Sequence, residues 1–206
     1  LKCRQTPDDQ IDKKVKEVAE ILNLQDFLNN RAKGLTADQK QLISLGRGLV
    51  REDVAAILMD EPLTVIDPDL KFRLRRKLKE INAKYKTTLI YVTHDQNEAM
   101  TFADNIIVMD EGEVVQAGSP KDLFEKPQTT FVGYFIGSPA MNLYECKADN
   151  SNQVSVGSNN IAVQTNLGST NTSNLKLGIR SEYITVEQSS GPNTIHADII
   201  EVEDFG

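Results

Sequence analysis

The stretch Ala55-Ala-Ile-Leu-Met-Asp60-Glu61-Pro62-Leu-Thr64-Val-Ile-Asp67 decides the fold. Five apolar residues run without a polar break and end in two adjacent carboxylates and a proline. An unbroken apolar run of this length predicts a strand that is buried on both faces of a parallel sheet. Residues at the carboxyl end of such a strand face the crevice in which α/β proteins bind ligands.

Two interpretations of Asp60 and Glu61 are compatible with this position. In the first, Asp60 holds a hard cation such as Mg²⁺, which prefers oxygen ligands, and Glu61 orients or deprotonates a water that attacks a phosphate. In the second, both carboxylates only begin the next helix, where negative charge is favourable. The local sequence gives the two interpretations about equal weight.

A second strand is predicted from Thr87 to Thr93, because this run is apolar and rich in β-branched residues. It ends in His94-Asp95. A lone histidine is usually a structural hydrogen-bonding residue, but His94 follows its strand as Asp60 and Glu61 follow theirs. Because carboxyl ends of neighbouring parallel strands meet at one edge of a sheet, the two ends are expected to converge on one crevice.

Apolar residues recur at helical spacing in four segments. The predicted helices cover residues 7–22, 37–51, 68–85 and 96–102. In the third helix, Phe72, Leu74, Leu78 and Ile81 are expected to carry the apolar side. The basic run from Lys71 to Lys79 is interpreted as a solvated face of that helix.

The second helix follows Leu35-Thr36-Ala37-Asp38-Gln39, in which Thr36 is a natural N-cap residue. The free amides of a helix start can bind a phosphate. The alternative is an ordinary capped helix, and the local sequence favours this alternative.

Short strands dominate the last third of the chain. Residues 105–109 and 113–116 predict a hairpin around Asp110-Glu-Gly112. The composition changes near Gly137-Ser138-Pro139, beyond which Asn, Ser and Thr are frequent. Further strands are predicted over residues 141–148, 153–156, 160–164, 175–180, 183–187 and 194–203. Short, regularly spaced strands indicate a small β-barrel or sandwich.

Length, charge and cysteine spacing limit the classes of protein to which the chain can belong. The 206 residues suggest one large domain or two small ones, and the net charge of −7 argues against a nucleic-acid surface. No apolar run approaches the roughly 20 residues that span a bilayer, and no secretory signal opens the chain. Cys3 and Cys146 lie far apart without metal-type spacing, so we expect them to be reduced and structural in a cytosolic setting.

Five segments stand in a fixed order that resembles the ATP-binding subunits of ABC transporters, in particular the maltose and glycerol-phosphate importer group. The resemblance covers essentially the whole chain. The segments are Leu35-Thr-Ala-Asp-Gln39, Ile57-Leu-Met-Asp60-Glu61-Pro62, Thr64-Val-Ile-Asp67, Tyr91-Val-Thr-His94-Asp95 and Gly137-Ser-Pro-Ala-Met-Asn142. They are similar, in this order, to the signature motif, the Walker B strand, the D-loop, the switch histidine and the entry to a regulatory domain.

This resemblance implies an incomplete ABC-type nucleotide-binding domain of the α/β class over residues 1–137. Its helical subdomain would cover about 1–48, and its parallel-sheet catalytic core about 52–118. Residues 138–206 would form part of a small β-barrel regulatory domain of the oligonucleotide-binding (OB) type. Leu177-Gly-Ile-Arg180-Ser-Glu182 is similar to a recurrent segment of that domain.

The resemblance also implies roles for single residues. Asp60 would hold Mg²⁺, Glu61 would be the general base, and His94 would contact the γ-phosphate. Asp67 would couple two subunits. Thr36, Asp38 and Gln39 would face ATP bound to the opposite subunit. These roles suit phosphoryl transfer, which needs a metal, a positioned water and charge stabilisation.

Two departures from the family pattern matter. No stretch of the chain resembles the Gly-rich phosphate loop with its Lys and Ser/Thr, which in the family lies upstream of the other motifs. The signature motif normally has two glycines where this chain has Ala37 and Asp38, so a side chain and a negative charge stand where backbone approaches phosphate.

The sequence therefore predicts a fragment of a longer ATPase that energises uptake of a sugar or a related solute such as glycerol phosphate. Its expected partners are a second ATP-binding subunit and transmembrane permease subunits. It would lie in the cytoplasm, peripheral to the cell membrane and without insertion into it. One alternative is a catalytically impaired assembly or regulatory protein, which the altered signature motif favours. Another is an ABC protein outside transport, which the regulatory-type β domain opposes.

Overall fold

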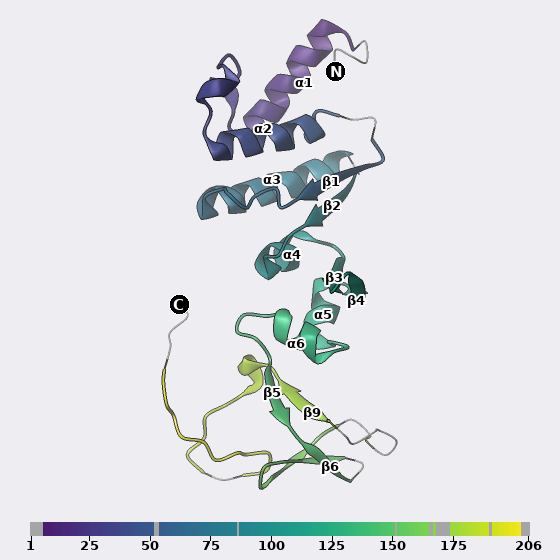
Figure 1. The fold of residues 1–206 in the computed structure, drawn as a ribbon, viewed down its shortest axis with the longest axis vertical. Helices are drawn as coiled ribbons and strands as arrows, with labels where there is room; N and C mark the ends of the chain where they lie inside the picture. Colours follow the sequence, from purple (N-terminus) through teal and green to yellow (C-terminus); the bar gives the residue numbers. More distant parts are fainter. Residues whose placement is uncertain are drawn as a thin grey trace. The chain divides into compact units, whose positions relative to one another are not determined.

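A computed structural model describes residues 6–51, 54–85, 87–150, 152–164, 167, 174–189 and 191–202 (Figure 1). The chain packs as two compact units, Leu1–Asp104 and Asn105–Gly206. Each unit has its own helices and strands.

Unit 1 has the four predicted helices and two predicted strands, joined by short 3₁₀ turns. Its elements are α1 (Asp8–Ile21), η2 (Gln25–Phe27), η3 (Ala32–Gly34), α2 (Ala37–Leu49), β1 (Ala56–Asp60), α3 (Pro68–Tyr85), β2 (Thr88–Val92) and α4 (Gln96–Phe102). Pro7 is the N-cap of α1 rather than its first helical residue.

The strands β1 and β2 pair in parallel, with Asp60 opposite Val92. The predicted convergence of the two strand ends is therefore confirmed. The prediction that the first strand is buried on both faces is wrong for the described sheet, because Leu58 is 69% exposed whereas Met59 is 5% exposed. The two-stranded sheet packs against the helices with one face, so successive side chains alternate between core and surface.

The core of unit 1 lies between the helices and one face of this sheet. It contains Val18, Ala19, Leu22, Leu24, Leu42, Leu45, Leu49, Met59, Leu63, Ile66, Leu74, Leu78 and Phe102. Gly46 lets α2 approach α1 closely, because a Cβ there would lie 3.1 Å from Leu22 Cδ1. The glycine that weakens α2 locally thus permits close helix packing.

Two expectations for α3 are corrected. Phe72 is 65% exposed instead of belonging to the apolar side, since it lies two residues from the buried Leu74 and points to another face of the helix. The basic run is not uniformly solvated. Lys71 and Arg75 pair with the buried Glu98, whereas Arg76 pairs with the exposed Glu80.

Unit 2 begins with the predicted hairpin, which is confirmed as β3 (Ile106–Asp110) and β4 (Glu113–Gly118). Glu111 and Gly112 both have positive φ, as a tight two-residue hairpin turn requires. Two short helices follow, α5 (Pro120–Glu125) and α6 (Thr130–Phe135), and the Ser119 hydroxyl caps the first of them.

The β part of unit 2 has two small antiparallel sheets. Its strands are β5 (Asn142–Glu145), β6 (Lys147–Asn150), β7 (Gln153–Val156), β8 (Asn159–Ala162) and β9 (Lys176–Ile179). β5 pairs with β9, and β7 lies between β6 and β8. Cys146 lies between β5 and β6 in the sequence, and its thiol is free and buried. Burial raises the pKa of this thiol. Cys3 lies outside the described residues.

Two predicted strands of this part are wrong. In the predicted strand 183–187, Tyr183 is the last residue of a 3₁₀ turn, η4 (Ser181–Tyr183), and residues 184–187 form no ladder. The described residues 194–202 form no strand either, and Ile200 is 97% exposed. A strand needs a neighbour for its backbone hydrogen bonds, and alternating apolar residues cannot supply one. No closed barrel occurs within the described residues.

Arg180 joins the sheet to the helices of unit 2. This side chain is 4% exposed, and its guanidinium lies 4.2 Å from the Phe124 ring centroid. It donates hydrogen bonds to the carbonyl oxygens of Phe124 and Gly133, both at 2.9 Å, and to that of Ile136. Burial lowers the pKa of Arg180, against the effect of the Glu182 charge. A single buried cation thus satisfies carbonyls from α5, α6 and the residue after α6.

Candidate active site

The site is centred on Glu61, the first residue after β1. Its φ is +47°, in the left-handed region that non-glycine residues rarely adopt. The backbone is held there from two elements. The Glu61 N–H donates to the Val92 carbonyl of β2 at 2.9 Å, and its own carbonyl accepts from Gln41 Nε2 of α2 at 3.1 Å. Strained backbone that is fixed from several sides is typical of functional sites.

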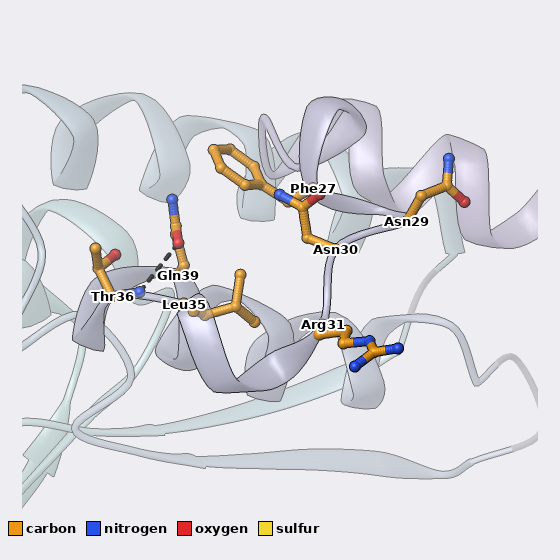
Figure 2. Close-up of a pocket in the computed structure, with 8 residues that line it drawn as sticks. Phe27, Asn29, Asn30, Arg31, Leu35, Thr36 and Gln39 are labelled. Carbon is orange, nitrogen blue, oxygen red and sulfur yellow. Dashed lines mark hydrogen bonds between the residues drawn. The ribbon is translucent and has the colours of Figure 1, made fainter.

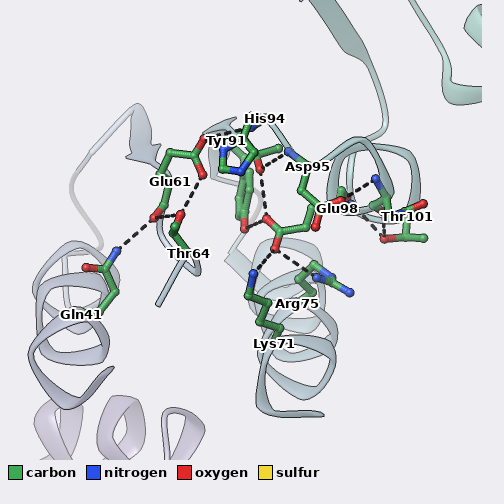
Figure 3. A network of polar contacts seen from close by, with 12 residues as sticks. Gln41, Glu61, Thr64, Lys71, Arg75, Tyr91, His94, Asp95, Glu98 and Thr101 are labelled. Carbon is green, nitrogen blue, oxygen red and sulfur yellow. Dashed lines mark hydrogen bonds and ion pairs between the residues drawn. The ribbon is translucent and has the colours of Figure 1, made fainter. Parts of the chain in front are cut away.

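The Glu61 carboxylate is fixed as firmly as its backbone (Figure 3). Oε1 accepts from the His94 N–H at 2.9 Å and lies 2.5 Å from His94 Nδ1. Oε2 accepts from the Thr64 hydroxyl at 2.8 Å. The structure thus brings together two of the predicted site residues, Glu61 and His94, at the carboxyl ends of β1 and β2.

Protonation states follow from these contacts. Burial disfavours the charged form of Glu61, but hydrogen bonds from His94 and Thr64 outweigh it and lower the pKa of this carboxyl. Glu61 is therefore ionised at neutral pH and cannot donate, so His94 Nδ1 carries the proton of the short contact. Nε2 of His94 stays available on a ring whose side chain is 77% exposed.

Asp60 is the last residue of β1 and is exposed beside Glu61. Among the described residues, no group of three His, Cys, Asp or Glu side chains could enclose a metal ion. Mg²⁺ is often held by one or two carboxylates together with waters and substrate phosphates. An exposed lone carboxylate at this strand end fits such a shared arrangement.

A pocket of about 460 Å³ lies at the N-terminus of α2 (Figure 2). Its lining residues are Phe27, Asn29, Asn30, Arg31, Gly34, Leu35, Thr36 and Gln39. Thr36 and Gln39 form a capping box, in which the Thr36 N–H donates to Gln39 Oε1 at 3.0 Å. Arg31 gives this mostly neutral, polar wall a positive charge.

The Asp38 carboxylate interacts with the Thr36 side chain of the same cap. The Thr36 hydroxyl donates to Asp38 Oδ1, and this hydrogen bond is the main reason why the pKa of Asp38 is lowered. An ionised carboxylate therefore stands in the first turn of α2, where the helix dipole favours an anion.

Asp67 lies apart from both groups, at the start of α3. Its Oδ1 accepts from the N–H groups of Asp69 and Leu70, at 3.0 and 3.3 Å. The predicted site residues therefore form three groups: the pair of Glu61 and His94 with Asp60 beside it, the α2 cap, and the α3 start.

Sequence reasoning missed three polar residues around the pair. Thr64 and Gln41 hold Glu61, and Glu98 of α4 is a carboxylate that is only 3% exposed. A sequence signal for Glu98 was available. This glutamate follows His94 by four residues and lies in the first turn of the predicted short helix, close to the end of the preceding strand.

No family model matches this chain. The oligosaccharides import ATP-binding protein MsmX of Bacillus subtilis is 40% identical along the whole chain, which covers 54% of that relative. The sn-glycerol-3-phosphate import ATP-binding protein UgpC 3 of Agrobacterium fabrum is 39% identical over 98% of the chain and 56% of its own length.

A third relative, the trehalose/maltose import ATP-binding protein MalK of Thermococcus litoralis, is 47% identical over 70% of the chain. Among solved structures, an ATP-binding cassette of an ABC transporter in its ADP conformation shares the fold. It has a TM-score of 0.50 at 24% identity, over 62% of this chain and 50% of the other. The α/β fold expected of an ABC ATPase is thereby confirmed.

The chain spans about half the length of the curated relatives it matches. Within the described residues, no helix has the length and apolar character that a bilayer crossing needs. Identity near 40% over essentially all of its residues shows that this chain is homologous to part of the ATP-binding proteins named for import of oligosaccharides, sn-glycerol-3-phosphate and trehalose/maltose.

Proposed function

We propose that this chain supplies the hydrolytic part of an importer ATPase, which energises uptake of a sugar or of glycerol phosphate. The observation that carries the proposal is the contact between Glu61 and His94, with the carboxylate ionised and held by hydrogen bonds from His94 and Thr64. The relatives' names give the solute classes: oligosaccharides, glycerol phosphate and trehalose or maltose.

In this proposal Glu61 is the general base. Three of its approximately four lone-pair sites accept hydrogen bonds, two from His94 and one from Thr64, so one site remains for an attacking water. A base fixed by hydrogen bonds needs little reorganisation during the reaction. The Nε2 edge of His94 would face the γ-phosphate.

Magnesium and a second subunit complete the proposal. Asp60 would hold Mg²⁺ together with ATP, and the bound ion would neutralise charge on the transferred phosphate. Thr36 and Gln39 at the α2 pocket would meet ATP held by a second copy of the protein, and Asp67 would lie at the junction between the copies. Permease subunits would be driven from the cytoplasmic face of the membrane. Residues 138–206 would belong to an OB-type regulatory domain.

The test uses a fusion protein in which the 206 residues are joined to the phosphate-loop segment of the Bacillus MsmX relative. We expect the fusion protein to hydrolyse ATP in the presence of Mg²⁺ and the 206-residue chain alone to hydrolyse none, since it has no phosphate loop. His94→Ala should remove the activity of the fusion protein. A folded, ATP-binding fusion protein without hydrolysis would contradict the proposal.

A catalytically impaired assembly protein is the second candidate. The observation that favours it is the hydrogen bond from the Thr36 hydroxyl to the Asp38 carboxylate. A phosphate at this cap would need the same hydroxyl as a donor. The same fusion protein separates the two candidates, because an assembly protein would bind ATP or its partners without turning ATP over.

A further inference from the structure

Glu98 is a buried carboxylate with partners on two sides (Figure 3). Its Oε2 accepts from the Tyr91 hydroxyl at 2.7 Å and from the Thr93 hydroxyl at 3.2 Å. Its Oε1 accepts no hydrogen bond among the described residues and faces Lys71 Nζ at 3.3 Å and Arg75 Nη1 at 3.4 Å. Oε2 thus contacts β2 and the residue that follows it, whereas Oε1 faces α3.

The strand-side oxygen leads directly to the loop that carries His94. The Thr93 hydroxyl, which donates to Glu98, also accepts from the Asp95 N–H at 3.0 Å. The Asp95 carboxylate in turn caps α4 by accepting from the Glu98 N–H at 3.3 Å. His94 lies between two residues that are tied to Glu98, while its own ring is exposed.

The helix-side oxygen connects this loop to α3. Lys71 and Arg75 lie one turn apart on the same face of α3. Their side chains are only 22% and 19% exposed. α3 begins at the residues capped by Asp67, and the Lys71 N–H donates to the Asp67 carbonyl at 2.8 Å. A buried carboxylate with two cations and two hydroxyl donors is strongly anchored, since removal of one partner leaves a charge in a dry site.

We propose that Glu98 is a positioning residue that ties the His94 loop to α3 and thereby holds His94 on Glu61. The proposal rests on the proposed function of the Glu61–His94 pair, and it assigns to Glu98 no contact with the reacting groups. Tyr91 supports the arrangement as a lasting donor, because burial, and then its hydrogen bond to Glu98, raise the pKa of its hydroxyl.

The test is amide hydrogen exchange of the 206-residue chain, measured by NMR. The reporter is the His94 N–H, which donates to Glu61 and contacts neither Glu98 nor Thr93 in the hydrogen-bond network. Glu98→Gln removes the charge that pairs with α3, and Thr93→Val breaks the loop side while Glu98 keeps its charge and its Tyr91, Lys71 and Arg75 partners. Glu80→Gln is the matched control, because Glu80 also pairs with two cations of α3, at 2.9 and 3.5 Å, but on an exposed face.

We expect both test variants to speed exchange of the His94 N–H by about tenfold or more, while exchange of the buried Leu78 N–H in α3 changes by less than about threefold. Thr93→Ser, which keeps the hydroxyl, should restore slow exchange at His94, and Glu80→Gln should change neither amide. This pattern would establish a local tie rather than a general contribution to stability.

Unchanged exchange at His94 in either variant would overturn the proposal, and so would equal acceleration at His94 and Leu78. The measurement needs no ATP, so it can fail while the fusion protein hydrolyses ATP, and it can succeed while hydrolysis is absent. The two proposals are therefore tested separately.

Discussion

The single residue on which the account depends is Glu61, and its conformation could not be predicted from its neighbours in the sequence. The apolar run predicts where the strand ends and which carboxylates follow it. The positive φ of Glu61 arises from partners far along the chain, Gln41 and Val92, which hold its carbonyl and its N–H. Long-range hydrogen bonds of this kind leave no mark in the local sequence.

Asp38 can be tested by a simple substitution, since the family resemblance places it where the signature motif has a glycine. Its carboxylate accepts from the Thr36 hydroxyl at the N-terminus of α2, where it would compete with the proposed phosphate for the same donors. We predict that Asp38→Gly, combined with Ala37→Gly, raises steady-state ATP hydrolysis of the fusion protein by roughly tenfold, because repulsion between two anions is removed.

A control for this prediction is Asp8→Gly at the first turn of α1, where an acidic residue faces no proposed phosphate. This variant should leave hydrolysis unchanged. Equal rates for the parent and the double variant, or a loss on restoring glycine, would mean that the altered signature motif works productively.

At the scale of elements, the helices and parallel strands could be predicted from the sequence, whereas the strands predicted over 183–187 and 194–203 do not form among the described residues. α3 was predicted over its full range because its apolar spacing and its proline start are both local signals. Which of its basic residues face inward depended on Glu98, one helix further along the chain. The alternating residues 194–202 lack a neighbouring strand in the described structure, and pairing is what distinguishes a strand from an extended segment.

The contact between the β5–β9 sheet and the helices α5 and α6 depends on Arg180. Arg180→Leu would leave the carbonyls of Phe124, Gly133 and Ile136 without this donor, so the free energy of unfolding should fall by about 2–4 kcal/mol. The matched control is Lys176→Leu on β9, the strand that Arg180 directly follows. Lys176 pairs with the exposed Glu145 at 3.5 Å, and such surface pairs contribute less than about 1 kcal/mol.

The measurement is urea-induced unfolding of the 206-residue chain, followed by circular dichroism. If Arg180→Leu costs no more than Lys176→Leu, the guanidinium does not hold the β5–β9 sheet against α5 and α6.

At the scale of the whole molecule, the order of the motifs carried more information than any one of them. The strand ends predicted one crevice, and the structure confirms that Glu61 and His94 meet there. The α2 cap and Asp67 were placed in the same active site only by the family resemblance, which assigns them to a junction between two copies.

The central claim is that Glu61 is the base of an ATP-hydrolysing site, and Glu61→Gln in the fusion protein tests it most directly. The substitution keeps the shape but removes the proton acceptor, so we predict that hydrolysis falls by about 10²–10⁴-fold. ATP binding should stay within about threefold, because the lost interaction belongs to the transition state. Glu80→Gln on the exposed face of α3 serves as the control and should change neither quantity. A Glu61→Gln fusion protein that hydrolyses ATP within about threefold of the unmodified one would contradict the account.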